Sequence, residues 1–339
     1  MPQERQMLDV AILLVNDGHA STAVGPMEVF SSAGRMWDEI RGTTPLSRFR
    51  VTTASVDGAP VESAFGLRIA PDRAIGEVAH ADLVFVASSG VMLSEVMESH
   101  AALLPWLVAR HEGGAMLAAV CSGAAFLAEA GLLDGRCATT HWGVAEAFSQ
   151  RYPQVDWRSD LLITEDDRIF CGGGVNAATD LSLFLVERLC GRETAIGCAK
   201  ALLLDMPRSH QSGYAILPMA RPHGDAQVRA LEDHLHAHYR DDIPIDAMAR
   251  LSGMGRRTLI RRFKAATGHM PGQYLQMVRI AVARQMLEAG GRSVKDVGAA
   301  VGYGDVAFFR DVFKRFSGLA PAAYRERFSR RLPPAPSDG

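Results

Sequence analysis

The sequence predicts two domains of different fold class: an α/β domain with a mainly parallel sheet, followed by an all-α domain with two helix-turn-helix units. Three observations support this prediction. In the first two-thirds of the chain, short apolar runs alternate with amphipathic segments, which is typical of an α/β layer fold. In the last third, a short helix, a glycine-containing turn and a second helix occur twice. The charge is also divided, because residues 1–220 hold 16 Lys and Arg against 26 Asp and Glu (net −10), whereas residues 221–332 hold 20 against 11 (net +9).

Length and composition indicate a multidomain protein of the cytoplasm. The 339 residues suffice for two domains. The sequence contains no apolar run of about 18 residues that would cross a membrane, and its N-terminus lacks the apolar core of a secretory signal. The five cysteines form no C-x-x-C pair, so we expect free thiols and neither a disulfide framework nor a zinc site. No cofactor is predicted.

The α/β domain is expected to contain five strands, each a short apolar run that turn residues bound. Amphipathic segments between them are expected to form helices. Ligands in such folds usually bind beyond the carboxyl ends of the strands, so the residues that follow those ends are the candidates for chemistry. The expected strands cover 10–15, 49–54, 83–87, 116–120 and 168–171, and the expected helices cover 27–33, 94–110, 124–130, 144–151 and 179–189.

The strongest catalytic signal is a cysteine placed between a strand and a helix. Cys121 directly follows the expected strand over 116–120, and the small Gly123 suits the tight elbow that such a turn needs. The helix N-terminus after it is expected to lower the pKa of the thiol. His141, twenty residues on, is a candidate base, since Cys and His together are the minimum for nucleophilic catalysis. The alternative is that Cys121 is a small buried thiol and His141 a pocket residue.

A glycine run ends another expected strand. Residues 172–174 are all glycine, and Val175 and Asn176 lead into the next helix. Their backbone N–H groups suit an anionic group such as a carboxylate, although close packing of strand and helix explains the run equally well. The run matches neither the G-x-G-x-x-G pattern nor a Walker motif, so a nucleotide site is not expected.

The stretch Val120-Cys-Ser-Gly-Ala-Ala-Phe-Leu-Ala-Glu-Ala-Gly-Leu-Leu-Asp-Gly-Arg-Cys-Ala-Thr-Thr-His-Trp142 resembles the amidase-like domain of the PfpI/glutamine-amidotransferase superfamily, and more narrowly the version in GlxA-type transcriptional regulators. The resemblance covers about residues 8–205 and implies a flavodoxin-like fold. Enzymes of the superfamily use the elbow cysteine, the histidine and an early acid. Thr22 stands where that acid is expected, with Asp17 as the nearby substitute, so an enzyme is not expected. The residues predicted to bind a small effector are Asp17, Cys121, Ser122, His141, Gly173 and Asn176.

The segment 207–225 is predicted to be an interdomain linker, because it is rich in Pro, Gly and Ser and lacks periodicity. Residues 226–240 follow as an amphipathic helix. This helix carries His234, His236 and His238, but their spacing places His236 on another face, so a solvated surface is the preferred interpretation over a metal site.

Two helix-turn-helix units follow, with helices expected over 245–251 and 256–266 and over 294–301 and 306–317. The segment 271–289 is expected to join them as a helix that starts at Pro271 and is about 28 Å long. Asp305 is placed to cap the second helix of the second unit. Phe263, Phe309, Phe313 and Phe316 are interpreted as core anchors rather than residues that stack on bases.

The basic third resembles the DNA-binding domain of AraC-family regulators over about residues 226–330. Matching residues include Arg257, Leu259, Arg261, Phe263, Pro271, Arg279, Val301-Gly302-Tyr303, Phe309, Phe313, Pro321 and Tyr324. The resemblance implies base contacts mainly from the first recognition helix. A departure in the second unit is Asp311, where the family usually has Arg. The residues predicted to contact DNA are Arg256, Arg257, Ile260, Arg261, Lys264, Val306, Ala307, Arg310 and Lys314.

Together these features predict a transcription regulator, with an activator preferred, that responds to a small metabolite such as an amino-acid-derived or betaine-like compound. The expected domains are 1–206 for sensing, 207–225 as linker, 226–330 for DNA binding and 331–339 as a tail. Double-stranded DNA, the effector, RNA polymerase and a second copy of the chain are the expected partners, and the resemblance implies activation. The alternative is a cysteine-dependent amidase or hydratase whose basic domain only localises it; a regulator that needs no ligand is a third interpretation.

Overall fold

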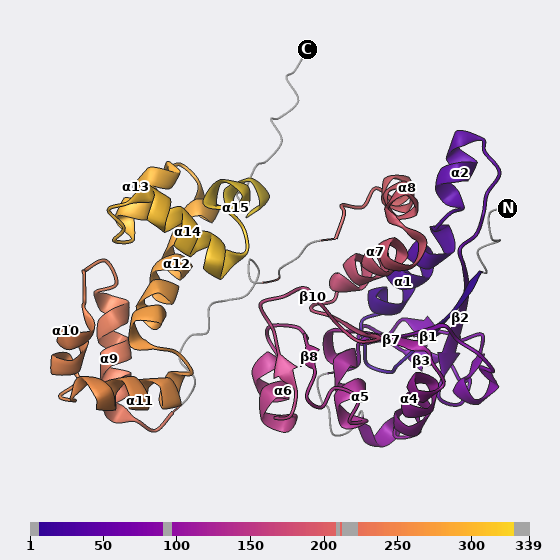
Figure 1. Ribbon diagram of the computed structural model, residues 1–339, viewed down its shortest axis with the longest axis horizontal. Helices are drawn as coiled ribbons and strands as arrows, with labels where there is room; N and C mark the ends of the chain where they lie inside the picture. The colour runs from indigo at the N-terminus through magenta and orange to yellow at the C-terminus, as the bar shows by residue number, and fades with distance from the viewer. Residues whose placement is uncertain (1–6, 91–96, 208–210, 212–222, 329–339) are drawn as a thin grey trace, which may run out of the picture. The chain divides into compact units, whose positions relative to one another are not determined.

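The computed structural model describes residues 7–90, 97–207, 211 and 223–328, and it divides the chain into two compact units, Met1–Gln211 and Ser212–Gly339. The first unit is built on a seven-stranded sheet with the order β10-β11-β7-β6-β1-β2-β5 (Figure 1). All neighbours pair in parallel except β10 and β11. The strands are β1 (Leu8–Leu13), β2 (Phe49–Ser55), β5 (Arg73–Ala74), β6 (Leu83–Val86), β7 (Met116–Val120), β10 (Ile163–Asp166) and β11 (Ile169–Gly172).

Helices cover both faces of this sheet because its central strands are apolar on both sides. Along β1, Val10 and Ile12 pack into one core and Ala11 and Leu13 into the other, as the two-residue period of a strand requires. Figure 1 shows α1, α7 and α8 on one side of the sheet and α4 and α5 on the other. The helices are α1 (Ser21–Ser32), α2 (Met36–Arg41), α4 (Leu103–Glu112), α5 (Ala124–Glu129), α6 (Ala145–Arg151), α7 (Ala177–Cys190) and α8 (Arg192–Leu202), with 3-10 turns η1 (Ile75–Glu77) and η2 (Cys121–Gly123).

Short strands and two displaced helices complete the unit. The pair β3 (Val61–Glu62) and β4 (Arg68–Ile69) is antiparallel, and β8 (Cys137–Ala138) pairs in parallel with β9 (Asp156–Trp157). The helix expected over 27–33 begins at Ser21 instead, since Pro26 removes only one backbone hydrogen bond and the helix still buries Val29 and Phe30. The helix expected over 94–110 is interrupted: residues 97–99 are helical, 100–102 form a turn and α4 follows, while residues 94–96 lie outside the described residues.

The second unit consists of helices around two small cores. The long α12 contributes Tyr274 and Val278 to the first core and Ile280 and Leu287 to the second, so it joins the two halves. Phe263, Phe309 and Phe313 are fully buried, which confirms them as anchors, and Phe316 is half-buried beside them. The helices are α9 (Ala226–Ala237), α10 (Ile245–Leu251), α11 (Arg256–Thr267), α12 (Pro271–Ala289), α13 (Val294–Ala300), α14 (Val306–Ser317) and α15 (Pro321–Phe328).

Candidate functional site

The cysteine elbow forms as the sequence predicts. Strand β7 ends at Val120, Cys121 adopts a φ of 56°, and the turn η2 leads directly into α5. A Cβ atom on Gly123 would lie 2.5 Å from the backbone oxygen of Ala87 at the end of β6, so only glycine lets the turn approach the neighbouring strand this closely. A positive φ at a non-glycine residue is a strained conformation that is common at functional sites.

The expected activation of the thiol is wrong. Burial raises the pKa of Cys121 above its ordinary value, and the hydrogen bonds from Ser122, which act in the opposite direction, do not outweigh it. Burial, and secondarily the nearby His19, lower the pKa of His141, so this imidazole is neutral at pH 7. A protonated thiol is a weak nucleophile, and a neutral imidazole supplies no positive charge that would stabilise the thiolate.

At the position of the expected acid, the Thr22 hydroxyl links two backbone segments by hydrogen bonds. Thr22 is completely buried; its hydroxyl donates to the carbonyl oxygen of His19 (2.6 Å) and accepts from the backbone N–H of Ser88 (3.0 Å). The substitute, Asp17, lies on an exposed loop with a φ of 61°, and its carboxylate forms no hydrogen bond or ion pair with any described residue. The position of the expected acid is therefore occupied by a threonine, and the Asp17 carboxylate does not take part in its hydrogen bonds.

The other predicted pocket residues follow the carboxyl ends of β7 and β11 in the chain. Ser122 donates to the backbone oxygen of Ser89 (2.6 Å), and the backbone oxygen of Cys121 accepts from the Thr140 hydroxyl (2.8 Å). A Cβ atom on Gly174 would lie 3.0 Å from Cδ2 of His141, so the glycine run passes directly beside the imidazole. Asn176 is exposed just before α7, and its side chain does not cap that helix.

Sequence reasoning missed Gln211, which lies inside the segment assigned to the linker. Its side chain is only 2% exposed and hydrogen-bonds to Thr139 and Thr140, and a Cβ atom on Gly173 would lie 2.7 Å from its amide. The sequence gives no sign of this contact, because a lone glutamine in a Pro- and Gly-rich segment is typical of a solvated linker.

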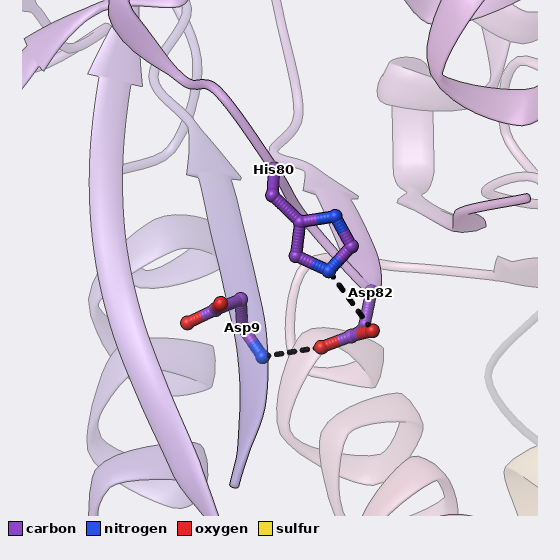
Figure 2. Close-up of side chains that lie close together, drawn as sticks. All are labelled: Asp9, His80 and Asp82. Atoms are coloured by element: carbon purple, nitrogen blue, oxygen red, sulfur yellow. Dashed lines mark hydrogen bonds and ion pairs between the residues drawn. The ribbon is translucent and has the colours of Figure 1, made fainter. Parts of the chain in front are cut away.

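A second polar cluster lies at the amino ends of the strands, at the edge of the sheet opposite Cys121. Figure 2 shows the Asp82 carboxylate joined to both His80 and the backbone nitrogen of Asp9. Its carboxylate accepts from the backbone N–H of Asp9 (2.7 Å) and lies 3.2 Å from Nε2 of His80. Both carboxylate oxygens of Asp9 already accept from the Arg50 guanidinium, which lowers the pKa of Asp9. The three side chains have the composition of a metal site, but a cation here would be next to Arg50, so the cluster is best described as an ion-pair network.

Both turns of the helix-turn-helix units depend on glycine. Gly253 has a φ of 65° between α10 and α11, and Gly302 has a φ of 88° between α13 and α14. After the second turn, the Asp305 carboxylate caps α14, since it accepts from the backbone N–H groups of Ala307 (2.7 Å) and Phe308 (2.9 Å). The cap predicted at Asp305 is therefore confirmed.

The basic side chains of α11 have two different environments. Arg257 and Arg261 are exposed and have no ion-pair partner among the described residues, whereas Leu259 and Phe263 on the opposite face are buried. Arg262, in contrast, is engaged within the protein. Its guanidinium donates to both carboxylate oxygens of Asp225 (2.6 and 2.8 Å) and to the side chain of Gln227, and this lowers the pKa of Asp225. Of the other residues predicted to contact DNA, Arg256, Lys264, Ala307, Arg310 and Lys314 are exposed, and Ile260 and Val306 are half-buried.

Two family profiles match the chain. The DJ-1/PfpI family matches residues 9–188, which is more than half of the sequence, and a helix-turn-helix domain matches residues 248–327. The chain belongs to the DJ-1/PfpI family. In this member a helix-turn-helix domain follows the family domain, which agrees with the resemblance to GlxA-type regulators. No described helix is long and apolar enough to cross a membrane.

Curated relatives of this DJ-1/PfpI protein include regulators that span both domains. It is 27% identical to the HTH-type transcriptional regulator GbdR of Pseudomonas aeruginosa, over 96% of this chain and 86% of the relative. It is 28% identical to the HTH-type transcriptional regulator GlxA of Rhizobium meliloti, over 82% of this chain and 86% of the relative. The isonitrile hydratase of Pseudomonas putida is 30% identical over 56% of this chain and 75% of the relative.

Proposed function

We infer that this protein is a DNA-binding transcriptional regulator whose DJ-1/PfpI domain senses a small metabolite. The observation that carries the proposal is the pair of helix-turn-helix units that the long helix α12 joins. Arg257 and Arg261 are exposed on the first recognition helix, α11. The names of the relatives that align over both domains support it. A binding-site selection with the full chain tests it: a defined DNA motif is expected, and recovery of unrelated sequences only would contradict the proposal.

The effector is proposed to bind at the carboxyl ends of β7 and β11. We propose Cys121, Ser122, His141 and Gly173 as its walls, because the Thr140 hydroxyl next to His141 donates to the backbone oxygen of Cys121 and the glycine run passes beside the imidazole. Asp17 and Asn176 are added on the sequence prediction alone. A polar pocket with backbone N–H groups and a neutral imidazole suits a small zwitterion, such as an amino-acid-derived or betaine-like metabolite. Footprinting of the selected DNA with and without a panel of amino acids and betaines tests whether binding depends on a ligand; equal protection throughout would favour a regulator that needs none.

DNA recognition is assigned to both second helices. Arg257, Ile260 and Arg261 are proposed to face base edges, and Arg256 and Lys264 the phosphates. On the second recognition helix, Val306, Ala307, Arg310 and Lys314 are proposed to contact the adjacent groove. The protein is proposed to act in the cytoplasm, where it activates transcription through contact with RNA polymerase.

A cysteine-dependent hydrolase or hydratase is the second candidate function, and the match to isonitrile hydratase is its support. We expect no turnover of small amides or isonitriles, because the thiol is held protonated and Thr22 replaces the acid. Alkylation by iodoacetamide should also be slow at pH 7 and accelerate only above pH 9, since burial raises the pKa of Cys121. Hydrolysis by the wild type that Cys121→Ser abolishes, or a thiol that already reacts fully at pH 7, would show that the site is catalytic.

The protein is proposed to form a homodimer through the DJ-1/PfpI domain. Two DNA-binding domains would double the number of phosphate contacts and therefore steepen the salt dependence of binding. Light scattering of the full chain should give twice the mass of one chain without DNA, and that mass plus one duplex with the selected DNA. A monomer in both samples would contradict the prediction.

A further inference from the structure

Gln211 fills a polar slot in the wall of the proposed effector pocket. Its amide nitrogen donates to the backbone oxygens of Thr140 (2.7 Å) and Leu161 (3.1 Å) and to the hydroxyl of Thr139 (3.2 Å). Its amide oxygen accepts from the backbone N–H of Trp142 (3.3 Å). Both ends of the carboxamide are therefore paired, and the side chain is almost completely buried.

This slot is continuous with the residues around the cysteine elbow. Thr140, whose carbonyl accepts from Gln211, donates its own hydroxyl to the backbone oxygen of Cys121. His141 lies between the two residues whose backbone groups bind the amide, and Gly173 leaves room for that amide where a Cβ atom would not fit. Gln211 thus packs against residues of the proposed pocket, although in sequence it follows the last helix of the α/β unit.

Gln211 also stands at the start of the connection to the DNA-binding unit. The next described residue is His223, whose Nε2 lies 2.8 Å from the buried carboxylate of Glu232 on α9. Two residues later, Asp225 forms its two hydrogen bonds with Arg262 on the recognition helix α11. Only residues 212–222 separate the side chain in the pocket from a segment tied to the recognition helix.

We propose that Gln211 is a displaceable internal ligand of the effector pocket, and that the effector which displaces it carries N–H donors next to an acceptor, as an amino acid or a primary amide does. The inference rests on the proposed function and narrows its ligand class. The backbone oxygen of Thr140 can only accept, so a replacement group must donate to it, while the N–H of Trp142 requires an acceptor; the Leu161 oxygen also accepts from the Thr139 hydroxyl. A fully methylated betaine has no N–H group, so it would leave the Thr140 oxygen without the donor that Gln211 supplies at 2.7 Å, whereas Leu161 would keep the Thr139 hydroxyl (2.9 Å).

Displacement would lengthen the tether between the two units. With Gln211 in its slot, the chain from residue 211 to His223 can span at most about 40 Å, at 3.3–3.6 Å per residue. Without it, the last described hydrophobic side chain that packs on this core is Met206, and the span from there to His223 is at most about 60 Å. A longer tether lowers the effective concentration of the DNA-binding unit near the α/β unit. Displacement of Gln211 by the effector would therefore loosen the restraint on the DNA-binding unit.

Proteolysis of the full chain tests whether Gln211 anchors the chain segment on either side of it to the α/β unit. Trypsin at Arg208 and chymotrypsin at Tyr214 cut on either side of Gln211, and mass spectrometry follows each bond. Gln211→Ala, and Gln211→Glu, which places an oxygen against two carbonyl oxygens, should each accelerate both cuts about tenfold. Gln150→Ala is the matched control, because Gln150 is exposed on α6. Unchanged cleavage in both Gln211 variants, with tryptophan fluorescence as in the wild type, would overturn the anchor.

The ligand class is tested with probes that differ in N–H groups. The common L-amino acids and their primary amides are compared with glycine betaine, which differs from glycine only by three methyl groups. At least one N–H-bearing probe should accelerate the cuts in the wild type, and calorimetry should show that it binds Gln211→Ala about tenfold more tightly, since the internal competitor is gone. Equal acceleration by glycine betaine, or none by any N–H-bearing probe, would overturn the proposal.

These measurements need no DNA. A failed binding-site selection would therefore refute the proposed function and leave the exchange at Gln211 measurable by itself. Conversely, a protein that selects a DNA motif but whose cleavage ignores Gln211 would retain the proposed function and lose this inference.

Discussion

Gly302→Ala should destabilise the second helix-turn-helix unit by about 2–4 kcal/mol. Gly302 has a φ of 88°, and an alanine in the left-handed region costs roughly 1–2 kcal/mol. The added Cβ would also lie 2.4 Å from the carbonyl oxygen of Arg240, which is backbone and has no rotamer to escape to. The turn must therefore open, and α13 and α14 lose the packing that buries Phe309 and Phe313.

The neighbouring glycine provides the control. A Cβ on Gly304 would meet no atom within 4 Å, so Gly304→Ala should change stability by less than about 0.5 kcal/mol. Helix loss on heating is followed by circular dichroism, and the four tryptophans, Trp37, Trp106, Trp142 and Trp157, report on the α/β domain alone. Equal melting of the two variants, or a matching change in tryptophan fluorescence, would contradict a local effect at this turn.

Helices with local start and stop signals could be predicted to the residue. The helix expected over 271–289 is α12, because Pro271 suits its first position and Gly290 follows it. The helix expected over 306–317 is α14, since Asp305 caps its start and Gly318 ends it with a φ of 71°. These signals act within one turn of the helix, so the sequence alone contains them.

Elements that depend mainly on tertiary contacts were not predicted from the sequence. Strand β10 pairs antiparallel with β11 at the edge of the sheet, and its residues Ile163–Asp166 include two acids that obscure the apolar pattern. Helix α8 starts after Gly191 and is stabilised by Cys198 and Ala195, which pack on the core beside α1. Such contacts between segments far apart in sequence leave little trace in a local pattern.

The candidate site shows the same difference between local signals, which the sequence contains, and tertiary contacts, which it does not. The elbow could be predicted because a strand, a small residue and a helix are consecutive in the chain around Cys121. The pKa of its thiol could not, because burial depends on the whole fold and outweighs the hydrogen bonds from Ser122 that lower the pKa. Gln211 was missed for that reason as well: its partners Thr139, Thr140 and Leu161 are 50 to 72 residues away.

The second large effect is expected at the first recognition helix. Arg257 and Arg261 are four residues apart, so they share one face of α11, opposite the buried Leu259 and Phe263. Arginine is suited to donate to O6 and N7 of guanine, which discriminates against other bases by about 1–3 kcal/mol per pair. Arg257→Ala and Arg261→Ala should therefore each erase base preference at one position of the selected motif and lower affinity about tenfold or more.

Three other variants distinguish contacts with base edges from contacts with phosphates. Lys264→Ala should weaken binding evenly across sequences and lower the salt slope by about one, as the loss of one phosphate contact does. Arg262→Ala should keep the motif, since its guanidinium is held by Asp225 and Gln227. Val306→Ala, on the second recognition helix, should alter the motif much less than either arginine variant. Binding-site selections at one fixed salt concentration compare all five. If Arg257→Ala and Arg261→Ala lose affinity uniformly while the motif is unchanged, these arginines hold the phosphates and another face of α11 reads the bases.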